Sequence, residues 1–401
     1  MTIAEVSLQQ QQNPMWGDDW ATVRSNWTLT ESVLHFNHGA YGSVPKAVRQ
    51  HQMSIIERVD QNATGFFRRE LELLLEDARL KAAKFCGADP DGFAWVKNVS
   101  EGMTVALAAM PLKAGDEVLI TNHIYPAVKF AVENRCRAVG AEIVEVQIPS
   151  SENDEELVSI IAAGITNRTR LLVVDEVASI SARIFPIREI AKITKAKNIT
   201  LIIDGAHALG TYEVELDTLG ADIWLGNFHK WMCSPHGAGA LWAAPQWRSK
   251  LNPSSVSYSD RKPYPQRFSR LGTDDQTAVL SVPAAIDFLS QLGLERVYAH
   301  NSALANFGAD AVAAAIGSTQ MPGKYGARRR VALPGGIVND DDAAYKLQRE
   351  IAEQLKTELS VSPPMTNEEP GTLGISAYVY NHPEEYERFG QALQKFLAKR
   401  K

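Results

Sequence analysis

Short apolar runs alternate with amphipathic stretches in the middle of the chain, between residues 90 and 245. Several runs are almost wholly apolar, as in strands that helices cover on both faces, and the stretches between them are long enough to supply those helices. This alternation predicts an α/β fold with a doubly wound, mostly parallel sheet. The predicted strands are Gly92–Val96, Glu117–Thr121, Glu142–Ile148, Arg170–Val177, Ile199–Asp204, Asp222–Phe228 and Ala238–Trp242.

The pattern changes beyond residue 250, where Asn252–Tyr264 is rich in Ser and Pro and predicts a loop. A second region follows, in which helical and β-branched stretches alternate again and predict a smaller C-terminal α/β domain. Its predicted elements are the helices Val282–Leu292, Leu294–Ile316, Asp341–Glu358 and Pro383–Lys399, and the strands Arg329–Leu333 and Leu373–Tyr380. We expect a large domain over residues 19–290 and a small domain over 291–401.

The N-terminal segment, residues 1–18, is predicted to be a flexible arm. It contains the run Gln9–Gln12, and a polar tract has no apolar surface to offset its ordering entropy. A helical pattern begins near Trp16 and leads to Phe36–Gly42, which Gly residues punctuate and which predicts a loop.

Composition narrows the classes of function. The 401 residues include 41 Lys and Arg against 47 Asp and Glu, a formal net charge of −6, so we expect no extended cationic surface for nucleic acid. The three cysteines form no C-x-x-C pair, which favours reduced thiols and a cytoplasmic location. We see no export signal and no apolar stretch long enough for a membrane span. These features favour small-molecule chemistry, without nucleic acid or membrane partners.

Reactive side chains follow two of the predicted strands. One strand ends in Asp204-Gly205-Ala206-His207, and the next ends in Asn227-Phe228-His229-Lys230-Trp231. Ligands bind beyond the carboxyl ends of strands in an open parallel sheet. Because Asp204 and Lys230 are one crossover unit apart, we expect an acid, a lysine and two histidines to share one crevice.

Pyridoxal phosphate requires such a set. Its aldehyde needs a lysine amine, for which Lys230 is the candidate, and its ring nitrogen stays protonated beside a buried carboxylate, for which Asp204 is the candidate. Its phosphate needs N–H donors, and Asn98-Val99-Ser100 joins a strand to a helix with Ser100 as the expected N-cap. Tyr125 follows a strand at the same sheet edge and is the candidate flat neighbour of the ring.

Each of these residues alone has a simpler interpretation. An Asp at a strand end is often a turn residue, a Lys after a strand is usually solvated, and a lone His or Tyr often belongs to the core. The cofactor hypothesis depends on their coincidence at one sheet edge.

These motifs resemble the class V aminotransferase family of fold-type I pyridoxal-phosphate enzymes, and within it the isopenicillin N epimerase-like branch. The resemblance covers roughly residues 34–288. The matching segments are Phe36–Gly42, Phe66-Phe67-Arg68-Arg69-Glu70, Asn98-Val99-Ser100-Glu101, Asp204-Gly205-Ala206-His207, Asn227-Phe228-His229-Lys230-Trp231 and Gly272-Thr273-Asp274-Asp275, with a weaker match at Tyr380-Asn381.

The resemblance implies that Lys230 forms the internal imine, that Asp204 holds the pyridinium and that His207 bonds the phenolic oxygen of the ring. It also implies that Thr273 reaches the phosphate in the second subunit, so that the enzyme is a homodimer with shared active sites. The cofactor-binding set comprises Lys230, Asp204, His207, His229, Asn98, Val99, Ser100, Tyr125, Asn227 and Thr273.

Two departures from the family pattern concern the substrate. Relatives often carry Leu-Arg-Ile-Ser, whose arginine grips the α-carboxylate, where this chain has Leu373-Gly374-Ile375-Ser376. Either another arginine, such as Arg183, supplies the clamp, or the substrate is bulky there or lacks that carboxylate. Glu176 replaces a common histidine and is expected to change the charge near the ring. The candidate substrate-binding residues are Asn37, His38, Arg68, Arg69 and Arg270.

The expected reaction begins when Lys230 removes the proton next to the nitrogen of an amino acid or related amine. The main hypothesis is epimerisation, with Tyr125 as a candidate second acid, and C–S lysis and transamination stay open. A persulfide-forming desulfurase is not expected, because no cysteine follows Cys233 and that chemistry needs one on a C-terminal loop.

Two other classes of protein could use some of these residues. A metal-dependent hydrolase would use Asp175, Asp204, His207 and His229, although Lys230 is an unfavourable neighbour for a metal ion. A cofactor-binding regulator would need an added basic DNA-binding segment, and the sequence shows none before Arg24.

Overall fold

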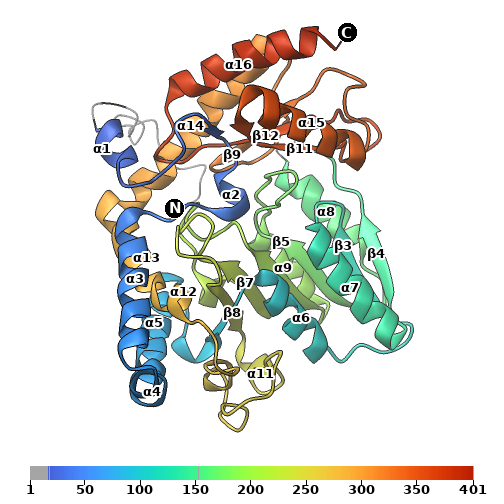
Figure 1. Ribbon diagram of the computed structural model, residues 1–401. Coiled ribbons are helices and arrows are strands. Elements are labelled where there is room, and N and C mark those ends of the chain that lie inside the picture. The colour runs from blue at the N-terminus through green and yellow to red at the C-terminus, as the bar shows by residue number, and fades with distance from the viewer. Residues whose placement is uncertain (1–16, 18, 152, 401) are drawn as a thin grey trace.

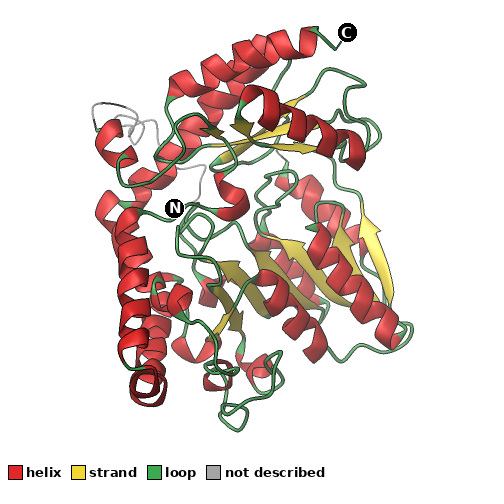
Figure 2. Cartoon of the chain, in the orientation of Figure 1, coloured by secondary structure: helices red, strands yellow, loops and turns green. Residues whose placement is uncertain are grey.

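The chain folds around a larger, seven-stranded β-sheet and a smaller, three-stranded β-sheet in the computed structural model, which describes residues 17, 19–151 and 153–400 (Figure 1). A short two-stranded parallel sheet also pairs Leu34–His35 with Thr357–Glu358. The larger sheet lies among helices in the lower part of the view, and the smaller sheet lies above it beneath the C-terminal helices (Figure 2). The predicted N-terminal arm lies outside the described residues, apart from Gly17.

The larger sheet contains all seven predicted strands. In spatial order these are β2 (Phe93–Val96), β8 (Gly239–Ala243), β7 (Ile223–Asn227), β6 (Thr200–Gly205), β5 (Thr169–Asp175), β3 (Glu117–Thr121) and β4 (Glu142–Val146). Strand β8 runs antiparallel to both neighbours, and the other pairs, from β7 to β4, are parallel. The prediction of a mostly parallel sheet is therefore confirmed.

Helices cover this sheet on both faces. They are α6 (Val99–Ala109), α7 (Pro126–Val139), α8 (Asp154–Gly164), α9 (Ile187–Ala196), α10 (Leu216–Leu219) and α11 (Pro245–Arg248). The direction of the strand order reverses after β4, and parallel crossovers are right-handed, so α7 and α8 lie on opposite faces. The connections that follow β3 and β5 therefore diverge, which opens a crevice at their carboxyl ends.

The N-terminal part supplies long helices beside the sheet. Its elements are α1 (Trp20–Arg24), β1 (Leu34–His35), α2 (His38–Tyr41), α3 (Lys46–Gln61), α4 (Ala63–Gly65), the π-helix η3 (Phe66–Glu70), α5 (Leu71–Phe85) and the 3-10 helix η4 (Pro90–Gly92). The prediction of a loop over Phe36–Gly42 was wrong, because α2 forms there. Gly42 ends this helix with a φ of 73°, a conformation that favours glycine.

The smaller sheet is antiparallel, with the order β11 (Ser360–Ser362), β12 (Thr372–Ser376) and β9 (Arg328–Ala332). The remaining elements are η5 (Gln266–Phe268), α12 (Thr277–Leu280), α13 (Val282–Leu292), α14 (Leu294–Ile316), α15 (Asp341–Leu355), β10 (Thr357–Glu358) and α16 (Pro383–Ala398). Helix α15 ends three residues before its predicted end, because Lys356 adopts a left-handed φ of 50°. Strand β12 ends at Ser376, four residues before its predicted end.

Two hydrophobic cores accompany the two sheets. The smaller core includes Phe36, which stacks on Tyr386 of α16 with ring centroids 4.1 Å apart. The N-terminal segment therefore also packs against the C-terminal region, while the division at residues 290 and 291 stays a prediction.

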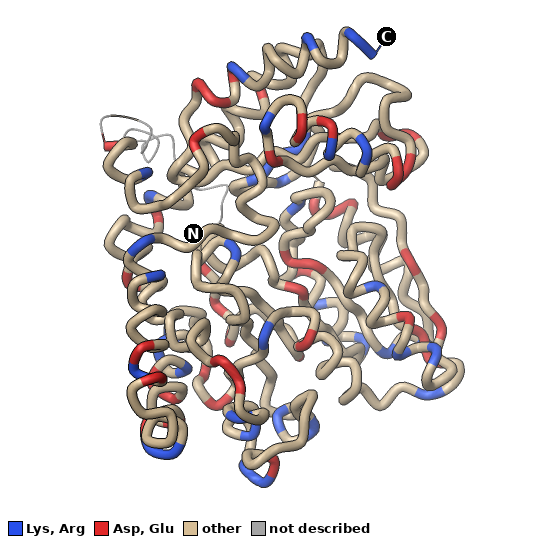
Figure 3. The backbone as a smooth tube through the Cα atoms, in the orientation of Figure 1, with Lys and Arg blue, Asp and Glu red and all other residues tan. Residues whose placement is uncertain are grey.

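Among the described residues, no individual helix combines the length and apolar character needed to span a membrane. One bent helix pair, Thr277–Leu292 with Leu294–Ile316, satisfies those two criteria jointly. Acidic and basic residues are interspersed along the chain in the view of Figure 3.

Candidate active site

Lys230 lies in the loop after β7, with its Nζ 3.0 Å from Nε2 of His207. Burial lowers the pKa of Lys230 to about 8, although the carboxylates of Asp204 and Asp175 oppose this shift. Its amine is therefore unprotonated more often at neutral pH than that of an exposed lysine, which makes it a better nucleophile and base.

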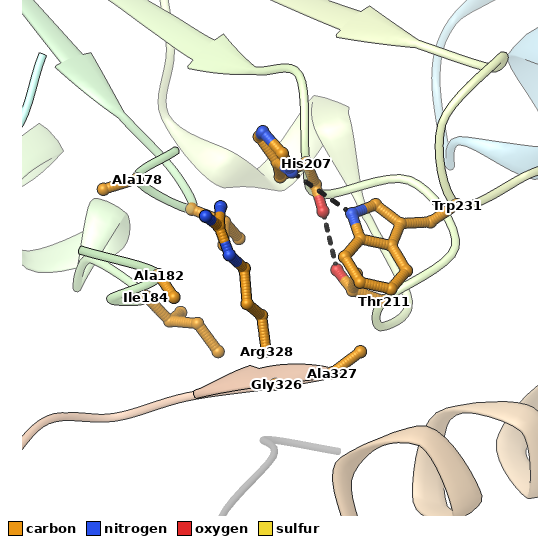
Figure 4. A pocket seen from close by; sticks show the side chains of 10 residues that line it. Ala178, Ala182, Ile184, His207, Thr211, Trp231, Gly326, Ala327 and Arg328 are labelled. Carbon is orange, nitrogen blue, oxygen red and sulfur yellow. Dashed lines mark hydrogen bonds between the residues drawn. The ribbon is translucent and has the colours of Figure 1, made fainter. Parts of the chain in front are cut away.

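Trp231 determines which nitrogen of His207 carries the proton. Burial, and then the charge of Lys230, lower the pKa of His207 well below its usual value, so this ring is neutral and has one N–H. The indole Nε1–H of Trp231 donates to Nδ1 of His207 over 3.2 Å (Figure 4). The proton therefore lies on Nε2, which faces Lys230, so His207 presents a donor to the crevice.

Two carboxylates lie side by side at the ends of β5 and β6, where Asp175 pairs with Asp204 in register. Burial raises the pKa of both groups, and the charge of Asp204 raises that of Asp175 further. Asp204 also accepts a hydrogen bond from the Ala206 N–H over 2.9 Å. The negative charge of the pair is therefore better stabilised on Asp204, as a partner for a cationic ring nitrogen requires.

The segment before α6 has N–H groups for an anion. Asn98 is the N-cap and accepts from the Glu101 N–H over 3.0 Å, so the prediction of Ser100 as N-cap was wrong. Asn227 accepts from the Val99 N–H over 3.1 Å and ties this segment to β7. Within the part of the chain that the structure describes, neither the amide nor the hydroxyl of the exposed Ser100 donates to another residue.

His229 adds a further polar group beside Lys230. Its Nδ1 is buried and has no hydrogen-bond partner among the described residues, and burial lowers its pKa to about 4. The free donors of Ser100, the orphaned nitrogen of His229, the amine of Lys230 and the carboxylate of Asp204 fit the phosphate, aldehyde and ring nitrogen of pyridoxal phosphate.

Tyr125 and Thr273 are both accessible. Tyr125 precedes α7, its side chain is 43% exposed, and its backbone N–H bonds to Asp175, which places it at the predicted sheet edge. Thr273 is exposed on a loop that an ion pair of 2.8 Å between Asp274 and Lys97 fastens beside the N-terminus of α6. Their predicted contacts with the ring and the phosphate stay predictions.

His38 has a different position from the one expected of a substrate-binding residue. Its ring is buried and stacks on Tyr378 with centroids 3.7 Å apart, and its Nδ1 is 2.8 Å from the hydroxyl of Tyr380. Its side chain also hydrogen-bonds the backbone of Lys230. These contacts place His38 against the lysine loop, and its predicted contact with the substrate stays a prediction. Asn37, the half-buried residue before α2, stays a candidate.

The predicted substrate-binding arginines are not gathered around Lys230 within this chain. Arg68 and Arg69 belong to η3, which follows α4 at the lower end of α3, whereas α2 adjoins the lysine loop at the other end (Figure 1). The guanidinium of Arg270 lies over the ring of Tyr258, 6.0 Å from its centroid. Arg183 is buried and pairs with Asp154 over 2.8 Å.

Glu176 does not face the predicted cofactor crevice. Because side chains alternate along β5 and its continuation, Glu176 points to the face opposite Asp175, where its carboxylate accepts from Trp224 Nε1 over 2.6 Å. Glu176 makes no direct contact with the crevice, but it still interacts electrostatically with Asp204, so the expectation that it changes the charge near the ring stays a prediction.

Arg328 was not anticipated from the sequence. It belongs to β9 of the smaller sheet and extends toward His207 in a small cavity that both residues line (Figure 4). Its positive charge lowers the pKa of both His207 and Lys230. An arginine run in a sequence usually indicates a solvated surface, so nothing local distinguished this buried side chain.

The metal-hydrolase alternative lacks a ligand cluster. In residues 17, 19–151 and 153–400, no three His, Cys, Asp or Glu side chains are grouped closely enough to hold a metal ion.

Replacing Trp231 with phenylalanine is expected to lower kcat by about tenfold, the effect of losing one hydrogen bond that orients His207. The absorbance of the bound cofactor should also titrate at a different pH, because either nitrogen of His207 can then carry the proton. A matched control is Trp247→Phe, which removes an indole donor to Asp222. Equal kcat values and equal spectra for both variants would contradict the assigned role.

Comparisons with known proteins extend over nearly the whole chain. The family model described as aminotransferase class-V matches residues 43–389. Isopenicillin N epimerase of Streptomyces clavuligerus is 29% identical over 397 residues, which cover 94% of this chain and 98% of that protein. Putative L-cysteine desulfhydrase 2 of Oryza sativa subsp. japonica is 26% identical over 419 residues, 94% of this chain and 88% of that protein.

The fold also has close counterparts among solved structures. The cystine C–S lyase C-DES, in a form with glycine covalently linked to its PLP cofactor, matches with a TM-score of 0.79. The match covers 92% of this chain and 98% of that chain at 16% identity. The chain therefore belongs to the aminotransferase class-V family of fold-type I pyridoxal-phosphate enzymes, as the sequence motifs predicted.

Proposed function

We propose that this enzyme exchanges the α-proton of an amino acid in an epimerase-like reaction, with Lys230 as the base. The observation that carries the proposal is the position of the Lys230 amine, with its pKa lowered to about 8, between His207 and two carboxylates at one sheet edge. The similarity to isopenicillin N epimerase over 94% of the chain supports this reaction class.

Pyridoxal phosphate supplies an aldehyde and an electron-accepting ring when it is bound. The chain supplies the proton transfers and the fixed charges around it. Nζ of Lys230 takes the proton from the substrate α-carbon, and the carboxylate of Asp204 would keep the ring nitrogen of the bound cofactor protonated. Nε2–H of His207 would donate to its phenolic oxygen, and the Ser100 amide and the His229 ring would hold its phosphate. Epimerisation also requires a proton donor on the other face, for which the accessible hydroxyl of Tyr125 is our candidate.

C–S lysis is the second candidate, because the relatives include L-cysteine desulfhydrases and the structural neighbours include a cystine C–S lyase. Burial raises the pKa of the Cys233 thiol to about 12, and its Sγ donates to the Tyr378 hydroxyl over 3.0 Å. Cys86 and Cys136 are also buried. A thiolate that accepts sulfur is therefore missing among the described residues, so a lyase of this architecture would release sulfide directly.

One experiment separates these reactions. The holoenzyme is incubated with L- and D-alanine, L-cysteine and L-2-aminoadipate in deuterated water, and α-deuterium, chirality, keto acid and sulfide are followed together. Deuterium uptake with loss of optical purity supports the epimerase. Keto acid formed with sulfide identifies a lyase instead, whereas keto acid formed with loss of the cofactor aldehyde identifies an aminotransferase. A protein that exchanges no α-proton contradicts the proposal.

The pH dependence of cofactor uptake tests the environment of Lys230. Because its pKa is lowered to about 8, the neutral amine of the apo protein becomes abundant as the pH rises through that value. The rate of reconstitution with pyridoxal phosphate should rise about tenfold between pH 7 and 9 and then level off. For Nα-acetyl-lysine, whose amine is unperturbed, the rate of the same reaction should keep rising toward pH 10. Parallel profiles would contradict the lowered pKa.

We further propose that the enzyme is a cytoplasmic homodimer in which Thr273 acts on the phosphate of the partner subunit. The exposure of Thr273 and of the apolar side chains Val256 and Tyr258, which are 83% and 91% exposed, supports a covered face around this loop. Mixing Lys230→Ala with Thr273→Ala subunits should restore one intact site per mixed dimer. No recovery of activity after subunit exchange would mean that Thr273 acts within its own chain. Cell fractionation tests the location, which three free thiols support.

A further inference from the structure

Strand β9 places three consecutive arginines in the interior between the two sheets. Arg328, Arg329 and Arg330 are all buried, and because side chains alternate along a strand, Arg328 and Arg330 share one face while Arg329 takes the other. No carboxylate forms an ion pair with any of these three within the described residues. Burial lowers the pKa of Arg328 to about 10, with no compensating negative group.

A buried cation without a counter-ion destabilises the folded protein, so a retained one indicates a ligand of opposite charge. The donors of Arg328 are only partly used. One terminal nitrogen donates to the carbonyl of Ser179 and the other to the hydroxyl of Ser360. The Nε atom is buried and has no acceptor among the described residues. The Nε–H and the unused N–H of the adjacent terminal nitrogen are therefore the donors left for a carboxylate.

The position of Gly374 explains why the arginine is on this strand. Gly374 of β12 pairs in register with Arg330 of β9. A Cβ at Gly374 would lie closest to Oγ of Ser360 and 2.8 Å from a terminal nitrogen of each of Arg328 and Arg330. The Ser360 hydroxyl and the two guanidinium groups thus occupy the space in which a side chain at residue 374 would begin. An arginine at residue 374 would have to displace these side-chain ends from their present positions.

The geometry points to Arg328 as the group that binds the carboxylate of the substrate. We propose that it receives the α-carboxylate, that Arg330 strengthens the positive potential behind it, and that the enzyme consequently selects amines that carry a carboxylate. This assignment rests on the proposed action on amino acids. It places the anion-binding side chain on the strand adjacent to the one that carries it in relatives with Leu-Arg-Ile-Ser.

The test compares two amines that differ in the carboxylate alone. Dissociation constants of L-alanine and ethylamine are measured from the absorbance of the holoenzyme cofactor. Wild-type enzyme should prefer L-alanine by about 100-fold, the effect of two charge-assisted hydrogen bonds. Arg328→Gln should abolish this preference by weakening the binding of L-alanine alone, and Arg328→Lys should retain part of it. The matched control is Arg329→Gln, which alters an equally buried guanidinium on the opposite face of β9 and should keep the preference.

Equal affinities of the wild-type enzyme for both amines, or an unchanged preference in Arg328→Gln, would overturn the assignment. If Arg328→Gln does not fold, the wild-type comparison and Arg328→Lys decide the question. The proposed function can fail independently of this assignment. A wild-type enzyme that prefers L-alanine through Arg328 but exchanges no α-proton would support the carboxylate site and contradict the epimerase proposal.

Discussion

Replacing Lys230 with alanine is expected to lower the rate of α-proton exchange by at least about 10⁴-fold, because the variant loses both the nucleophile and the base of the proposed site. Nζ of Lys230 is the amine that the structure holds 3.0 Å from His207 and close to the charge of Asp204. Deuterium incorporation into the substrate measures this loss directly. In the wild-type enzyme, borohydride should also fix the cofactor to the peptide that contains Lys230.

The control for this variant is Lys192→Ala on α9, whose side chain is 76% exposed and belongs to no part of the proposed site. It should retain wild-type exchange and wild-type labelling by borohydride. Circular dichroism and the thermal midpoint establish that the Lys230 variant is folded. A folded Lys230→Ala protein with more than a hundredth of the wild-type rate, or cofactor fixed to another peptide, would show that the base is a different residue.

The strands of the larger sheet were predictable because their signal is local. A strand buried on both faces needs an apolar run, and its carboxyl end is where the run stops. Asp204 and Lys230 follow such stops, so their chemistry could be located from the sequence. The same dependence on where a predicted strand stops explains why Asp175 was not assigned to the cofactor site. The predicted strand extends to Val177, although β5 ends at Asp175, so the prediction places this carboxylate inside the strand.

Residues that depend on packing between distant segments could not be predicted in this way. His38 is in a Gly-punctuated motif typical of a binding loop, and its burial results from contact with Tyr378, which is 340 positions further along the chain. The role of Arg328 depends on the register between β9 and β12, which no local pattern encodes. The absence of the usual arginine at residue 374 was visible in the sequence, whereas the neighbouring side chains that fill its space were not.

The exchange of Asp204 for asparagine is expected to lower kcat by about 10²- to 10³-fold, the typical effect of removing one preorganised electrostatic partner. Asparagine keeps the size of the side chain and removes the charge that holds a proton on the ring nitrogen. The same charge raises the pKa of Lys230, so the reconstitution profile of the apo variant should move to a midpoint below 8.

The matched comparison for Asp204→Asn is Asp175→Asn, on the neighbouring strand in register. Burial and the charge of Asp204 raise the pKa of the wild-type Asp175 well above its usual value, so this side chain already resembles a neutral amide. Asp175→Asn should therefore lower kcat by less than about tenfold, far less than Asp204→Asn. The reverse order of the two effects would mean that Asp175 carries the charge of the pair and that it, and not Asp204, faces the ring nitrogen. That order would also move the predicted ring position one strand closer to Tyr125, because β5 lies beside β3 in the sheet.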